Sequence, residues 1–147
     1  MKKTNEGNGF PPSLLEDLYS SGSGYDILRY IGLPELFGGE THTLLYFMGR
    51  KLARHFTFNE LDDIYNAFER LGWGKLELVK EKRKELVFSL MDDSIVRKLT
   101  SALPVDFRLE AGFLAEAVNM AFDKSAECMD DINFKIHSVR LTVLYTS

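Results

Sequence analysis

The sequence predicts an α+β domain in which helices pack around a small antiparallel sheet. The first observation is residues 106–122, DFRLEAGFLAEAVNMAF, where apolar positions cover most of the circumference of a helix. The second is that residues 75–91 and 128–145 each have the composition of a strand pair. Because the helices and strands occur in separate blocks, the pattern favours an α+β arrangement over alternating βαβ units.

We expect the helix at 106–122 to lie at the centre of the domain, packed on several sides. At about 100° per residue, one narrow stripe gathers the positions expected to face solvent, which are Arg108, Gly112, Glu116, Asn119 and Asp123. Small residues such as Ala111 and Ala115 would let a neighbouring backbone come close. The buried bulk should include Phe113, Leu114 and Val118.

Length and composition indicate one domain, covering residues 10–147 after a loose, polar stretch at 1–9. The chain has 147 residues and is 45% hydrophobic, which provides material for a core. Its formal net charge of -4 argues against broad binding to nucleic acid.

Cellular location is indicated by the single Cys128, which allows no intrachain disulfide and fits a reducing cytoplasm. The first ten residues contain no apolar run typical of a secretory signal. The longest apolar run, residues 44–48, is too short to span a bilayer. We therefore expect a cytoplasmic protein with no membrane span.

The first half of the chain reads as helical. Residues 13–19 predict two turns, residues 20–24 a flexible break, and residues 25–31 a short helix that ends at Gly32 and Pro34. Residues 41–56 predict an amphipathic helix with Arg50, Lys51 and Arg54 outside its apolar stripe. That stripe, the expected buried face, consists of Leu44, Met48, Leu52 and Phe56, joined by Leu45 and Ala53.

A second amphipathic helix is predicted up to Leu71, with Gly72 ending it. Thr57 followed by Glu60 fits a capping box, and Phe56 with Leu61 fits a hydrophobic staple. We expect Thr57 to be the N-cap.

Strands follow. Residues 75–80 and 85–91 predict a hairpin whose tip is the polar run 81–84. Residues 92–94 should cap a short helix at 95–100, and Pro104 should break the chain before the central helix. Residues 128–136 and 139–145 predict a final hairpin.

No residue pattern identifies a reaction. His42, His55 and His137 match no metal-ligand spacing, so we expect no metal and no cofactor. The glycines lack phosphate-loop spacing, and the basic run 80–84 is more simply a solvated hairpin tip than a phosphate contact.

Two side chains are candidates for chemistry. Cys128 could be a nucleophile, although a buried bystander thiol is the more ordinary reading. Glu116 lies in the most apolar helix and is either exposed, which we favour, or a partly buried acid.

Four segments carry a resemblance to known families. Residues 108–122 and 39–56, with Gly49 inside the latter, together with the strands at 126–136 and 139–145, resemble vinyl-reductase-type domains, whose fold is shared with subunits of the TRAPP vesicle-tethering complex. Over nearly the whole chain, the sequence resembles the YslB-like family of small bacterial proteins. Paired cysteines found in the last strands of several vinyl-reductase-type domains are missing here, so their metal site is not carried over.

The resemblance implies a TRAPP-subunit-like fold, frequent pairing of two copies, and in some relatives a small apolar or acyl ligand between helices and sheet. We therefore expect a non-catalytic binding module and homodimer that could hold an apolar small molecule beside the central helix. The expected ligand-binding residues are Tyr46, Phe113, Glu116 and Met120. The alternative is a small cytoplasmic enzyme that uses Cys128 or Glu116.

Overall fold

The computed structural model describes residues 22–146, and the predicted helix at 13–19 lies outside them. The helical first half contains α2 (Ser23–Ile27), the π-helical turn η2 (Leu28–Gly32), α3 (Leu33–Phe37), the 3₁₀ turn η3 (Gly38–Glu40), α4 (Thr41–Ala53) and α5 (Leu61–Arg70). The second half contains β1 (Lys75–Lys82), β2 (Glu85–Met91), α6 (Asp93–Leu99), α7 (Arg108–Phe122), β3 (Ala126–Asn133) and β4 (Ser138–Tyr145). The predicted mixed α+β class is confirmed.

The strands form one antiparallel sheet in the order β1-β2-β4-β3. Each of the two predicted hairpins is present, and the two hairpins join through pairing of β2 with β4. Inward positions are apolar in register across the sheet, as in the row formed by Leu78, Phe88 and Leu141. The ladder of β1 and β2 is interrupted by a bulge between Leu78 and Lys80.

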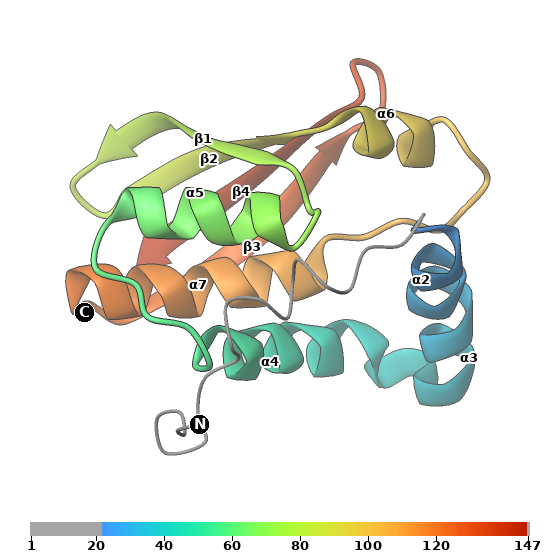
Figure 1. The fold of residues 1–147 in the computed structure, drawn as a ribbon, viewed down its shortest axis with the longest axis horizontal. Coiled ribbons are helices and arrows are strands. Elements are labelled where there is room, and N and C mark those ends of the chain that lie inside the picture. Colours follow the sequence, from blue (N-terminus) through green and yellow to red (C-terminus); the bar gives the residue numbers. More distant parts are fainter. Residues whose placement is uncertain (1–21, 147) are drawn as a thin grey trace.

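The layers are sheet, then α7, then α4 (Figure 1). Helix α7 lies across one face of the sheet, α5 covers the part of that face near β1, and α4 packs on the far side of α7. Every residue of α7 from 109 to 118 is therefore buried. The predicted central helix is confirmed, with its first turn starting at Arg108.

The solvent stripe predicted for this helix is wrong in its middle. Gly112 is buried, and Glu116 is only 7% exposed. Both face α4, which covers the side of α7 that periodicity alone assigned to solvent. Asp123, at the end of the stripe, is exposed and ends the helix with a φ of 54°.

Helices α4 and α7 touch backbone to backbone. A Cβ atom built on Gly49 would lie 2.1 Å from the Leu109 carbonyl oxygen. A Cβ atom built on Gly112 would lie 1.9 Å from the Tyr46 carbonyl oxygen. Only a residue without a side chain can occupy either position at this separation, so the two glycines fix how closely and at which register the helices cross.

The same contact turns α4 relative to the predicted orientation. Leu44 and Met48, expected in the core, are 41% and 39% exposed. Leu45 and Ala53, which joined the predicted stripe, are buried, and so are Tyr46 and Gly49. Leu52 and Phe56 are half-buried against the core. The four-residue stripe failed because the contact is centred on a glycine, which a hydrophobicity pattern does not detect.

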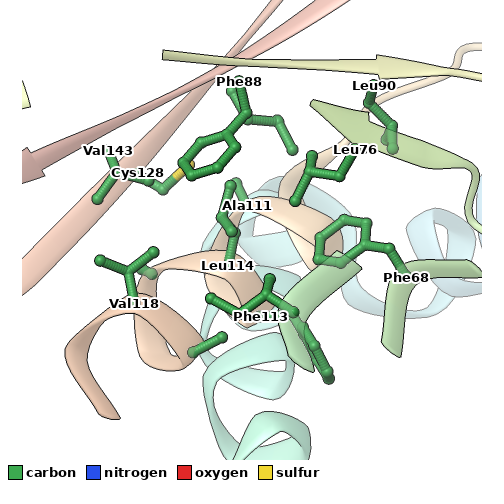
Figure 2. Packing of buried hydrophobic residues seen from close by; sticks show 14 of the residues in the cluster. Phe68, Leu76, Phe88, Leu90, Ala111, Phe113, Leu114, Val118, Cys128 and Val143 are labelled. Atoms are coloured by element: carbon green, nitrogen blue, oxygen red, sulfur yellow. The ribbon is translucent and has the colours of Figure 1, made fainter. Parts of the chain in front are cut away.

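On its other side, α7 inserts Phe113 into an aromatic cluster (Figure 2). The Phe113 ring is fully buried, and its edge-to-face partners have ring centroids 5.1 to 5.7 Å away. Those partners are Phe56, Phe58, Phe68 and Trp73. The cluster joins α7 to α5 and to the loop before it.

Of the helix ends predicted from local sequence, two are confirmed and the N-cap of α5 is wrong. Asp92 accepts a hydrogen bond from the Ser94 N–H at 2.9 Å and caps α6 as predicted, and Gly72 follows α5 with a φ of 77°. Thr57, however, is exposed and four residues before α5 begins. The N-cap is Glu60, and its N–H and that of Asn59 donate to the Asp63 carboxylate at 3.2 and 2.7 Å.

The N-terminal helices also differ from the prediction. Ser23 and Gly24, placed in a flexible break, belong to α2. The chain does not leave the helical conformation at Gly32 or Pro34, because Pro34 falls in the first turn of α3, where its missing N–H leaves no bond unmade.

We expect Gly112→Ala to destabilise the protein by about 1–3 kcal/mol or more, because the new methyl group must push α4 away from α7. Urea unfolding measures the change. Gly39→Ala is the matched control, since a Cβ atom there meets nothing within 4 Å. Equal stability of the two variants would contradict the close crossing.

Candidate functional site: a polar network between α4, α7 and the edge of the sheet

The candidate site is a network of charged and hydroxyl groups at the junction of α4, α7 and β3. Tyr46 and Arg50 are four residues apart on α4 and so share one face. That face is turned toward Glu116 of α7 and Glu127 of β3 by the glycine crossing just described. The network therefore depends on the fold rather than on a local motif.

Glu116 binds two arginines. Arg50 Nε donates to one of its carboxylate oxygens at 3.1 Å, and Arg54 Nε donates to the other at 3.2 Å. Both oxygens of this buried carboxylate are thus occupied by charged donors, which compensates for the loss of water. The expectation that Glu116 is exposed is wrong, because the apolar helix carries the acid toward a basic face of α4.

Arg50 links three elements. Its Nη1 donates to the Glu127 carboxylate and to the Ala126 carbonyl oxygen, both at 2.9 Å, while its Nε holds Glu116. The guanidinium group is largely buried, with 13% of the side chain exposed. Burial alone would lower the pKa of Arg50, but Glu127 and the other partners raise it, so the cation persists.

The Tyr46 hydroxyl lies at the centre of the network. It donates to the Glu127 carboxylate and accepts from the Cys128 N–H at 3.0 Å. Burial, and then the hydrogen bond to Glu127, raise the pKa of Tyr46 to about 12. The phenol is therefore a proton donor at neutral pH and not a base.

The network also closes one edge of the sheet. Strand β3 is an edge strand, so its outward N–H and C=O groups have no neighbouring strand. Tyr46 accepts from the N–H of Cys128, and Arg50 donates to the C=O of Ala126. Further along, Arg108 Nη1 donates to Asp130 at 2.9 Å and its guanidinium lies 4.7 Å from the centroid of the Tyr46 ring. Side chains from two helices thus replace a fifth strand.

A second polar cluster fastens the N-terminal helices to α7, and sequence reasoning missed it. Arg29 is 1% exposed. Its Nη atoms donate to both oxygens of Glu110, at 3.0 and 3.2 Å, and to Asp106 at 3.1 Å. Burial opposes the charge, but Glu110 keeps the pKa of Arg29 raised. A usable signal was present in the sequence, namely an arginine inside an apolar helical segment and two acids four residues apart.

The four predicted ligand residues do not form one group. Tyr46 and Glu116 meet through Arg50. Phe113 projects into the aromatic cluster and makes none of the network's contacts. Met120 is 38% exposed in the last turn of the helix. Their role in holding a ligand stays a prediction.

Cys128 is buried on the inner face of β3, beside Phe88 and Val143 (Figure 2). Its sulfur makes one weak hydrogen bond among residues 22–146, to the Met129 carbonyl oxygen at 3.8 Å. Burial raises the pKa of the thiol well above its ordinary value. The group is a packing residue with little thiolate at neutral pH.

Within residues 22–146, no group of three or more His, Cys, Asp or Glu side chains is placed to hold a metal ion. Within the same residues, no helix has the length and apolar character needed to cross a bilayer.

The architecture has a close parallel among solved structures. A crystal structure described as a vinyl-4-reductase family protein from Methanocaldococcus jannaschii superposes with a TM-score of 0.62 over 92% of this chain and 94% of that one. Sequence identity is 14%, so the likeness shows the fold alone. The protein thus has the fold of a vinyl-4-reductase family protein.

Residues 22–144 match the family described as "Protein of unknown function (DUF2507)", and the chain belongs to that family. The uncharacterized protein YslB of Bacillus subtilis is 33% identical over 129 residues, which cover 88% of this chain and 87% of YslB. The uncharacterized protein MJ1642 of Methanocaldococcus jannaschii is 25% identical over 101 residues, which cover 68% of this chain and 61% of MJ1642. The resemblance to YslB-like proteins is confirmed.

We expect Tyr46→Phe to destabilise the protein by about 1–3 kcal/mol, because the buried Cys128 N–H loses its acceptor. Urea unfolding measures the loss, and amide hydrogen exchange should be faster at Cys128. Tyr145→Phe is the matched control. It also removes a tyrosine hydroxyl, but that hydroxyl makes no hydrogen bond to residues 22–146, so stability should change little. Unchanged exchange at Cys128 would contradict the edge-sealing role of Tyr46.

We expect Cys128 to react slowly with iodoacetamide at pH 8 in the native protein and rapidly in urea, because its thiol is buried and protonated. Mass spectrometry of timed samples gives both rates. Fast native alkylation would instead support a nucleophilic role for Cys128.

Proposed function

We propose that this protein is a non-catalytic binding module that works as a homodimer in the reducing cytoplasm and holds a small apolar ligand beside the end of α7. The observation that carries the pairing is the apolar outer surface of the N-terminal helices. The large hydrophobic side chains exposed there are Tyr25, Ile27, Leu28, Ile31, Leu36, Leu44, Phe47 and Met48. Soluble monomers rarely leave such a group uncovered.

One stripe of α4 has the pattern of a twofold interface. Leu44, Phe47 and Met48 are exposed in its middle, with exposed Glu40 before them and exposed Lys51 after them. At about 100° per residue these five positions lie on the same side of the helix. The stripe is thus apolar at its centre, acidic at one end and basic at the other.

Such a stripe is complementary to itself when two copies run antiparallel. A twofold axis midway between Leu44 and Phe47 sets each of these residues opposite the other in the second copy. The same axis sets Glu40 opposite Lys51. Isologous pairing therefore buries the apolar centre and matches opposite charges at both ends, which favours a second copy over an unrelated partner as the occupant.

The geometry supports binding rather than catalysis. The two residues of the enzymatic alternative are both engaged, since Cys128 is buried and protonated and Glu116 is held by Arg50 and Arg54. The single cysteine of the chain also fits a reducing compartment. For the ligand, support comes from the last turn of α7, where Met120 and Phe122 each leave 38% of their surface exposed.

Sedimentation equilibrium tests the pairing. We expect the apparent mass of the wild type to approach twice the chain mass of 16.8 kDa. This should occur at roughly tens of micromolar protein, the range in which weak dimers assemble. Phe47→Asp should return it to a monomer, because each copy would have to bury a carboxylate against Leu44 of the other copy. Val79→Asp, on the exposed side of β1, is the matched control and should still pair. A wild-type monomer at these concentrations would overturn the dimer.

Charge exchange tests the antiparallel arrangement itself. Glu40→Lys and Lys51→Glu should each weaken pairing, by about two- to fivefold for an exposed pair. The double variant should restore it, since each copy again presents opposite charges. A double variant weaker than either single variant would exclude this axis.

A further inference from the structure

The β1–β2 hairpin, the start of α5 and the end of α7 lie at the same end of the molecule (Figure 1). A groove is lined by residues from these elements. Its volume is about 400 Å³, which is within the range of small-molecule sites. No residue of the Tyr46 network lines it.

The floor of the groove is apolar and comes from five elements. Leu61 begins α5, Leu78 lies on β1, Leu86 lies on β2, and Phe122 and Tyr145 end α7 and β4. Leu86 is buried, and the others keep part of their surface open. The floor is therefore the accessible edge of the hydrophobic core and offers an apolar molecule a surface to cover.

The rim of the groove is basic. Lys82, Arg83 and Lys124 line it, against a single carboxylate, Glu81. None of the three cations forms an ion pair with any residue between 22 and 146. Lys124 Nζ is held 4.8 Å from the centroid of the Tyr145 ring, which places its charge over the floor. A locally positive rim stands out in a protein whose formal net charge is -4.

We propose that this groove binds an amphipathic anion, a hydrocarbon body with one terminal carboxylate or phosphate group. The hydrocarbon would cover the leucines and Phe122, and the anionic group would lie among Lys82, Arg83 and Lys124. The inference rests on the proposed function, because it gives the binding module its class of ligand, but pairing through α4 is measured separately.

Tyr145 suits such a ligand. Burial, followed by the nearby Glu81 carboxylate, raises the pKa of its phenol, so the hydroxyl remains a donor at neutral pH. No described residue accepts that proton. The hydroxyl can therefore donate to an anionic group that sits beside Lys124.

Glu81 is a diagnostic position, because its negative charge would repel an anionic ligand. Glu81→Gln should strengthen binding of an anion, whereas Lys124→Glu should weaken it, each by about fivefold. Lys75→Glu makes the same charge change at the other end of β1 and is the matched control. All three positions are exposed, so the fold should be retained.

Isothermal titration calorimetry with decanoate, kept below its micellar concentration, tests the proposal on the full chain. We expect saturable binding that changes in the stated direction in each variant and is unchanged in Lys75→Glu. Decyltrimethylammonium tests the sign of the charge, and inorganic phosphate tests the apolar floor. Both should bind more weakly than decanoate.

Four results would overturn the proposal: no decanoate binding, equal binding of decyltrimethylammonium, equal binding of phosphate, or insensitivity to Lys124→Glu. Binding only to vesicles of anionic lipid, without free decanoate binding, would overturn it as well and point to a membrane surface. Sedimentation equilibrium separates the two proposals, because pairing is measured without decanoate. If the wild type pairs but does not bind decanoate, the ligand proposal is rejected and the dimer proposal stands.

Discussion

The structure depends on the contact between the backbones of α4 and α7 at Gly49 and Gly112. Each glycine faces a carbonyl oxygen of the opposite helix at a distance that excludes a side chain. Because the two helices can approach this closely only at the glycines, the contact sets which face of α4 is turned toward α7. It thereby places Arg50 against Glu116 and Tyr46 against the edge of β3. It also leaves Phe47 on the outer surface, so the polar network and the proposed pairing surface are two results of one packing constraint.

The polar network shows how charge can be buried without becoming reactive. Glu116 has both carboxylate oxygens bound, Arg50 is shared among four acceptors, and the Tyr46 hydroxyl both donates and accepts. A catalytic acid or base needs a free site from which a proton can come or go, and these groups use theirs on one another. The groove between the β1–β2 hairpin and α7 has the opposite character, with an open floor and cations that form no ion pair within residues 22–146. The polar network and the proposed ligand site thus lie in different parts of the fold.

The sequence predicted those features that are set locally. The two hairpins, the Asp92 cap, the Gly72 helix end and the apolar central helix depend on neighbours within a few residues. It misplaced those set by partners far along the chain. Glu116 lies on the stripe that periodicity gives to solvent, and only the docking of α4 covers it. The N-cap of α5 was misassigned because both Thr57 and Glu60 begin plausible capping boxes, and the choice between them depends on where the helix docks. Arg29 and its two acids are about eighty residues apart, so local patterns can mark each of them as unusual but cannot pair them.

The bonds that seal β3 join residues separated by 76 to 82 positions. Ribosomes make the chain from the N-terminus, so α4 leaves the exit tunnel long before α7 and β3 exist to receive it. Until then its Gly49 face and its outer apolar stripe are both uncovered, and the loop that must close is long. Burial of the Gly49 face of α4 therefore waits until α7 and β3 have been made, near the end of synthesis.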